Sequence, residues 1–181
     1  PAAQLTILGQ SKDTHVHRKI ILHAMNRLAR RDSMGAKKHW DKIKSSFDFS
    51  DEEKQMIDKR IALSAAYQHK PESKELLQDL PDDQKTADAH LWLARIHLRD
   101  EDWIGLIKTI NNMPDHLKKE TEWEYWLARA YDEAGQTVTA FNSFSRLASN
   151  SSYYGFLAAD KIKTAYTINQ QQASVTNPVN E

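Results

Sequence analysis

The sequence contains no cysteine among its 181 residues. Disulfide bonds, catalysis by a thiolate and zinc sites built on cysteine are therefore excluded. The absence fits reducing and oxidising compartments equally well, so it does not indicate where the protein works.

Glycine and proline are scarce, with five of each. The β-branched residues form no alternating runs, so the chain is predicted to be helical. No apolar run approaches the roughly 20 residues that a membrane-spanning helix needs. The chain begins at Pro1 without a signal segment of charged and then apolar residues, so we expect a mature chain or an excised fragment.

An excess of charge of one sign is also lacking. Lys plus Arg and Asp plus Glu both total 25, and the signs alternate locally, as in residues 82–85. Without a strong field of one sign, neither nucleic acid nor an anionic membrane surface is expected as a partner.

The familiar catalytic and metal-binding patterns are missing. There is no HExxH, no GxSxG and no glycine-rich phosphate loop. His15 and His17 point to different faces of a helix, because residues two apart do not share a face. His90 and His97 share a face, but no acid beside them completes a ligand set in the sequence. We therefore predict no metal site.

Apolar stripes at helical spacing predict a series of short helices. Ser50 and Glu53 form the pattern of a capping box at the start of one of them. Pro71 suits the first turn of the next, where its missing amide would have no partner. The expected helices cover residues 15–31, 36–47, 50–68, 71–81, 84–100, 101–112, 116–134, 136–149 and 151–166.

A short segment occurs twice. Residues 92–95, Trp-Leu-Ala-Arg, recur at 126–129, a shift of 34 positions that matches a tetratricopeptide-type helical hairpin. After the second copy, Gly135 falls where the turn needs positive φ, and Ala140 and Phe144 fall where two helices cross. The equivalent of Gly135 in the first copy is Glu101.

This rhythm predicts an all-α fold, an α-α superhelix of irregular tetratricopeptide-like hairpins, as one domain over residues 1–166. Residues 167–181 are rich in Gln, Asn, Ser and Thr and carry no apolar stripe. They are predicted to be a polar linker or tail that leads to downstream domains absent from this chain.

The tract from Trp103 to Tyr166 contains the second copy and ends in the apolar block 153–159, Tyr-Tyr-Gly-Phe-Leu-Ala-Ala. Together these features resemble the superhelical region of the soluble lytic murein transglycosylases. The resemblance extends upstream to Ala87, and before that it rests on the rhythm of the helical hairpins.

The resemblance implies a periplasmic parent enzyme that cleaves the β-1,4 bond between N-acetylmuramic acid and N-acetylglucosamine of peptidoglycan, leaving a 1,6-anhydro end. In that family the catalytic glutamate lies in a Glu-Ser pair of a separate lysozyme-like domain. The one Glu-Ser pair here, Glu72-Ser73, follows Pro71 and lies between two lysines, so we interpret Glu72 as the N-terminal acid of a helix. The resemblance therefore implies a non-catalytic scaffold fragment with no cofactor.

The implied partners are the protein's own downstream linker and catalytic domains and the glycan strands of peptidoglycan. Two adjacent tyrosines on a helix cannot face the same side, so one of Tyr153 and Tyr154 is expected to be offered outward. With Phe156, they are the predicted surface on which the downstream domains dock.

Arg95 and Arg129 occupy equivalent positions in the two copies. Their guanidinium groups are candidates to line a concave face and hold carboxylates of peptidoglycan. The alternative for both is a structural role as bridges between adjacent helices.

Two other functions are compatible with the same residues. A tetratricopeptide-like adaptor that binds a protein or peptide would use the same hairpin spacing, although the aromatic block would have no role in it. A free-standing enzyme is the third reading, and nothing in the motifs supports it.

Overall fold

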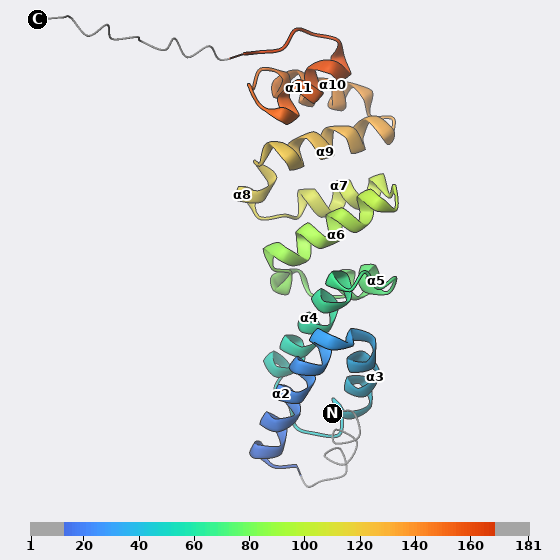
Figure 1. Ribbon diagram of the computed structural model, residues 1–181, viewed down its shortest axis with the longest axis vertical. Coiled ribbons are helices and arrows are strands. Elements are labelled where there is room, and N and C mark those ends of the chain that lie inside the picture. The colour runs from blue at the N-terminus through green and yellow to red at the C-terminus, as the bar shows by residue number, and fades with distance from the viewer. Residues whose placement is uncertain (1–12, 169–181) are drawn as a thin grey trace, which may run out of the picture. The chain divides into compact units, whose positions relative to one another are not determined.

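The computed structural model describes residues 13–168 as helices joined by short turns, with no β-strand in that range (Figure 1). The predicted all-α character is therefore confirmed. The chain divides into two compact units, Pro1–Asp102 and Trp103–Glu181. Most of the predicted tail 167–181 lies outside the described residues, as does the start of the predicted domain, so those boundaries stay predictions.

Unit 1 contains five α-helices and one 3-10 turn within its described residues. They are α2 (His15–Arg31), α3 (Ser33–Ile43), α4 (Asp51–Tyr67), α5 (Ser73–Gln78), η1 (Asp82–Gln84) and α6 (Ala87–Arg99). Helices α2, α3 and α4 pack against one another, and α4, α5 and α6 form a second contacting group.

Two apolar clusters fill unit 1. The first lies among α2, α3 and α4, where Trp40 and Met25 have no exposed surface. The second lies among α4, α5 and α6 and includes Leu77 and Leu93. Ile61 in the first cluster and Ala62 in the second are neighbours on α4, so this helix takes part in both.

The start of α4 confirms the capping-box prediction. The Ser50 hydroxyl accepts from the Glu53 amide at 3.2 Å, and the Glu53 carboxylate accepts from the Ser50 amide at 3.0 Å. The expectation for α5 is wrong in its extent, because this helix begins at Ser73 and leaves Pro71 in the preceding turn. The turn is closed by a 3.1 Å bond from the Ser73 amide to the Lys70 carbonyl.

Unit 2 contains α7 (Trp103–Asn111), α8 (Asp115–Lys118), α9 (Thr121–Glu133), α10 (Thr137–Ala148) and α11 (Tyr153–Ile162) in its described part. Helix α9 packs against α7 on one side and α10 on another, and α10 packs against α11. Its core joins Tyr125 and Ala128 of α9 to Phe144 of α10 and Ala158 of α11. The predicted packing roles of Ala140 and Phe144 are confirmed, since they are 1% and 3% exposed.

The prediction of one continuous helix over 116–134 is wrong. The chain ends α8 at Lys118, and Glu120 is extended with φ −69° and ψ 131° before α9 begins. Leu117 is buried in the short first piece, and Trp123 is buried in the second. The break allows both apolar residues to be buried although they do not belong to one straight helical face.

Positive φ ends a helix at both copies of the repeat. Gly135 follows α9 with φ 76°, as predicted, and Glu101 follows α6 with φ 54°. The backbone bonds match, because the Gln136 amide donates to Tyr131 at 2.8 Å and the Asp102 amide donates to His97 at 2.9 Å. The first copy therefore keeps the turn geometry although its sequence has lost the glycine.

Glu101→Gly is expected to raise the free energy of unfolding by about 1 kcal/mol. An L-residue in the left-handed region costs roughly 1–2 kcal/mol, and the larger entropy of glycine in the unfolded chain offsets only part of that cost. The measurement is urea unfolding of the two proteins. A loss of stability would show that the glutamate side chain contributes more than its backbone strain costs.

Candidate functional site

A surface of aromatic and basic side chains surrounds Arg95 in unit 1. The Arg95 guanidinium carbon lies 5.7 Å from the ring centroid of Trp92, one helical turn earlier on α6. The rings of Tyr67 and His69 meet the same indole edge-on, with centroids 5.1 and 5.8 Å away. We call these four residues the Trp92 surface.

The turn after α4 positions two members of this surface. His69 has φ 52°, and the amides of His69 and Lys70 donate to the Ala66 and Ala65 carbonyls at 3.0 and 2.9 Å. Tyr67 remains 53% exposed, and Arg95 is exposed with no ion-pair partner among residues 13–168. Aromatic rings beside an unpaired guanidinium can contact a sugar ring and a carboxylate at once.

Arg129 of unit 2 lies in a different environment. Its guanidinium pairs with Glu133 one turn later at 2.8 Å, and its Nε is buried without a hydrogen-bond partner. The pair lies along a single helix, α9. These contacts support a structural role for Arg129 within its own helix and distinguish it from Arg95.

Helix α11 carries the predicted docking residues. Tyr153 is 69% exposed, whereas Tyr154 turns inward and its ring lies 5.5 Å from that of Tyr125. The Phe156 ring lies 5.3 Å from Tyr166, whose hydroxyl donates to Asp160 at 2.6 Å. One tyrosine inward and one outward is the arrangement that the sequence predicted, and the docking role itself stays a prediction.

Glu72 does not resemble a catalytic acid. It is the N-cap residue of α5, is exposed, and makes no side-chain capping bond. Within the described range, no group of three or more His, Asp or Glu side chains is placed to hold a metal ion. No helix among residues 13–168 is both long and apolar enough to cross a membrane.

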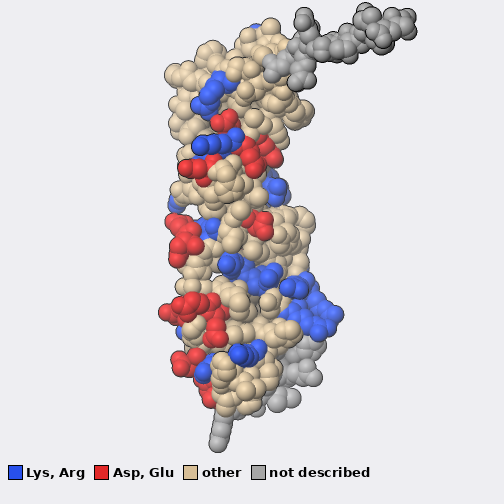
Figure 2. Space-filling view, turned by 90° about the vertical axis from the view of Figure 1, so that its left-hand side faces the viewer, with Lys and Arg blue, Asp and Glu red and all other residues tan. Residues whose placement is uncertain are grey.

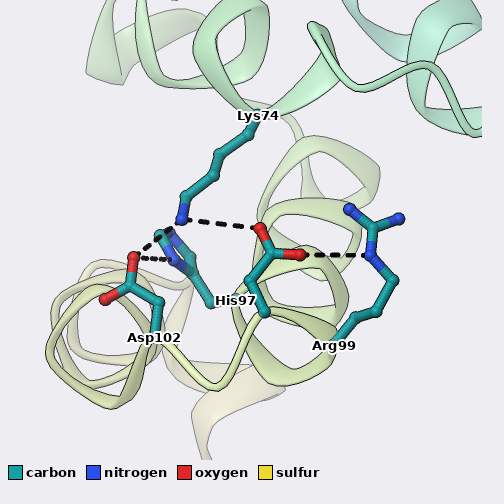
Figure 3. Close-up of polar contacts among 5 residues, drawn as sticks. Lys74, His97, Arg99 and Asp102 are labelled. Carbon is teal, nitrogen blue, oxygen red and sulfur yellow. Dashed lines mark hydrogen bonds and ion pairs between the residues drawn. The ribbon is translucent and has the colours of Figure 1, made fainter.

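Asp102, just after α6, joins the buried His97 of α6 to Lys74 of α5 (Figure 3). His97 Nδ1 lies 2.8 Å from Asp102 Oδ2, and the same oxygen accepts from Lys74 Nζ at 2.8 Å. Asp100 lies 3.6 Å from Lys74 and 3.2 Å from the Arg99 Nε. The sequence did not indicate this cluster, because Lys74 is 28 residues from Asp102.

Unit 1 is expected to lose stability as the pH falls below about 6.5. Burial lowers the pKa of His97, against the raising effect of Asp102, and burial and Lys85 lower the pKa of His90. The fold then binds fewer protons than the unfolded chain in this range, so stability present above the unfolded pKa of about 6.5 is lost below it. Urea unfolding between pH 8 and pH 5 measures the slope.

The matched variants are His97→Gln and His23→Gln. The first removes a buried titrating ring and should flatten the pH dependence, and the second changes an exposed residue of α2 and should leave the slope unchanged. Equal slopes in all three proteins would contradict the assignment to His97.

The surface shows no broad region of one sign on the face seen in Figure 2, apart from one group of basic side chains at its right-hand edge. Elsewhere on that face, acidic and basic patches lie close together. Local ion pairs also occur among the described residues, for example Lys118 with Asp115 at 2.9 Å. This agrees with the equal totals of 25 basic and 25 acidic residues.

No protein-family model and no curated protein sequence matches the chain. Among solved structures, an inactive mutant of the lytic transglycosylase Slt from Pseudomonas aeruginosa is similar over 92% of this chain, with a TM-score of 0.80 and 28% identity. This chain resembles the superhelical region of the soluble lytic transglycosylases. The predicted fold class, an α-α superhelix, is thereby confirmed.

Two further structures show the fold alone. The 70-kDa soluble lytic transglycosylase of Escherichia coli matches 90% of the chain with a TM-score of 0.68 and 21% identity. A structure of the 70-kDa enzyme in complex with bulgecin A gives a TM-score of 0.69. The chain spans only 27% of the length of the Pseudomonas protein and 26% of the other two chains.

Proposed function

We propose that this chain is a non-catalytic scaffold region of a soluble lytic transglycosylase. The observation that carries the proposal is the match to 92% of this chain at a TM-score of 0.80 combined with coverage of 27% of the enzyme. A helical region of this kind would position a catalytic domain and restrain the substrate. In the intact protein the reaction would be cleavage of peptidoglycan between N-acetylmuramic acid and N-acetylglucosamine, giving 1,6-anhydro ends in the periplasm.

The residues present support a scaffold rather than a catalyst. The reaction needs one carboxylic acid that first protonates the glycosidic oxygen and then accepts a proton from the attacking 6-hydroxyl, which requires a raised pKa. Glu72, in the one Glu-Ser pair of the sequence, is exposed at a helix end and beside Lys74.

The Trp92 surface is the part of unit 1 best suited to contact the glycan. Trp92 and Tyr67 offer ring surface, and the Arg95 guanidinium is available for a lactyl or peptide carboxylate. Arg129, already paired with Glu133, is the weaker of the two predicted glycan contacts.

Incubation with purified peptidoglycan tests the scaffold role. We expect no anhydro-muropeptides by mass spectrometry, but retention of the chain in the pellet after sedimentation with glycan strands. Arg95→Ala should reduce retention, and Arg146→Ala, an exposed arginine of α10, should not. Anhydro products made by the chain alone would overturn the non-catalytic role, and capture of envelope proteins without glycan would favour the adaptor.

The exposed part of α11 is proposed as the docking surface for the downstream linker and catalytic domains. Tyr153 is the sharper probe, because Tyr154 packs on Tyr125 and its loss would also destabilise unit 2. Tyr153→Ser should weaken association with the downstream domains of the parent gene supplied as a separate chain. Val138→Ser changes a residue of α10 that is 77% exposed and is the control. Equal affinity of both variants would refute docking at α11.

A further inference from the structure

Helix α2 of unit 1 (blue in Figure 1) carries a local excess of positive charge. Its 17 residues, His15–Arg31, include five Lys or Arg and three His but no Asp or Glu. Equal totals over the whole chain predict no anionic partner, but they conceal this local excess. The inner side of the helix is apolar, with Ile21 and Met25 fully buried in the core, so the charge lies on the outer side.

The exposed residues of α2 form one continuous face. At 3.6 residues per turn, their positions fall within about half of the circumference of the helix. All of them are Lys, Arg, His or aliphatic residues, and Val16 and Ile20 are 63% and 45% exposed. We call this set the α2 face: His15, Val16, Lys19, Ile20, His23, Arg27, Arg30 and Arg31.

No acid among residues 13–168 pairs with the cations of this face, which are Lys19, Arg27, Arg30 and Arg31. The acids next to α2 in the sequence are engaged elsewhere. Asp13 pairs with Arg18 at 2.7 Å, on another side of the helix. Asp32 accepts from the Gly35 amide at 2.8 Å at the start of α3. The α2 face therefore presents its positive charge to the surroundings.

The stability of the helix does not explain this charge. The helix dipole favours cations at the C-terminal end and acids at the N-terminal end. Arg30 and Arg31 lie in the last turn and fit that preference, but Lys19 and Arg27 lie outside it, and the first turn contains no acid. Helix α4 of the same unit, in contrast, begins with three acids in its first turn. Departures of this kind from local preference are expected where side chains serve an external contact.

The shape of the α2 face suits phosphate groups. His23, Asn26, Arg27 and Arg30 line a hollow of about 420 Å³. Arg27 and Arg30 are neighbours on adjacent turns because they are three residues apart, and guanidinium groups bind phosphate oxygens in pairs. Val16 and Ile20, four residues apart, lie nearer the N-terminal end of the same face. Aliphatic side chains beside cations are typical of a helix face that contacts a lipid surface.

We propose that the α2 face binds an anionic phospholipid surface. The negative potential of such a surface attracts Lys and Arg over about one Debye length. Arg27 and Arg30 contact lipid phosphates, and Val16 and Ile20 enter the headgroup boundary. A nucleic acid also offers phosphates, but it has no apolar layer for the two aliphatic side chains. Because the inner side of α2 stays packed in the core, the contact is peripheral. The proposal goes beyond the scaffold role, since it concerns where unit 1 is held.

Sedimentation of the full chain with lipid vesicles tests the proposal. We expect binding at low salt to phosphatidylcholine vesicles that contain about one-third phosphatidylglycerol, release at high salt, and no binding to phosphatidylcholine alone. Arg27→Gln combined with Arg30→Gln should weaken binding roughly 25-fold, because each Lys or Arg near the surface contributes about fivefold. Lys108→Gln combined with Arg146→Gln removes the same charge from exposed positions of unit 2 and should leave binding unchanged.

Ile20→Ser distinguishes a lipid surface from other polyanions. It keeps every charge of the α2 face but should weaken vesicle binding severalfold, and far-UV circular dichroism checks that each variant stays folded. The proposal is overturned if neutral vesicles bind equally well, if the two double variants bind alike, or if inorganic phosphate displaces the chain from the vesicles. Tighter binding to a DNA duplex than to vesicles, with Ile20→Ser unchanged in both, would assign the face to nucleic acid instead. These experiments contain no glycan and no downstream domain, so their failure would leave the scaffold role untouched.

Discussion

Gly155→Ala is expected to destabilise unit 2 by roughly 3 kcal/mol or more, by disrupting the corner between α10 and α11. A Cβ at this position would lie 2.0 Å from the Asn150 carbonyl oxygen and 3.0 Å from that of Leu147. Both atoms belong to the backbone at the end of α10, so no side-chain rotation relieves the clash. Helix α11 would have to move away from α10, and buried Ala158 and Ala159 would lose their packing.

Urea unfolding followed by tyrosine and tryptophan fluorescence measures this loss. Gly135→Ala is the matched control, because the same methyl group meets no atom within 4 Å there and its cost, about 1 kcal/mol, comes from φ 76° alone. If the two variants lose the same amount, the close approach at Gly155 is not limiting. Helix α11 carries tyrosine but no tryptophan. A change in tyrosine fluorescence alone in the Gly155 variant would therefore place the damage in that helix.

The local features of the fold were predictable because short-range rules govern them. The capping box at Ser50 and the positive φ of Gly135 follow from hydrogen-bond and steric preferences within four residues. The break at Glu120 was missed, since neither glycine nor proline marks it and the burial of Leu117 and Trp123 decides it.

The candidate sites were predictable only where one helix builds them. The opposite directions of Tyr153 and Tyr154 follow from helical geometry alone. Tyr67 and His69 were missed as neighbours of Trp92, because the turn at His69 brings them there from α4. A cleft of unit 1 that Asp58 lines was also missed. Its lining comes from α3, α4, α5 and the segment that follows α5, and it matches no sequence motif.

Trp40→Ala is expected to reduce the free energy of unfolding of unit 1 by about 3–5 kcal/mol, the usual cost of truncating a large buried aromatic residue. Trp40 has no exposed surface, and its ring lies 5.1 Å from that of Phe49 in the core among α2, α3 and α4. The loss should appear as a lower urea midpoint. A cost below about 1 kcal/mol would mean that the surrounding helices close the cavity.

Trp40→Phe separates packing from hydrogen bonding at the same position. Phenylalanine retains much of the contact with Phe49 but removes the N–H that Asp58 accepts at 2.9 Å. Losing the partner of a half-buried carboxylate costs about 1–3 kcal/mol, so this variant should be less destabilised than Trp40→Ala.

The loss of stability in Trp40→Phe should also shrink as the pH falls towards the raised pKa of Asp58, because a protonated carboxyl needs the indole N–H less. Trp40→Ala should keep most of its deficit at low pH, since a cavity does not titrate. A pH-independent loss in Trp40→Phe would assign the whole effect to the change of side-chain shape. The hydrogen bond from the indole to Asp58 would then make no measurable contribution to the free energy of unfolding.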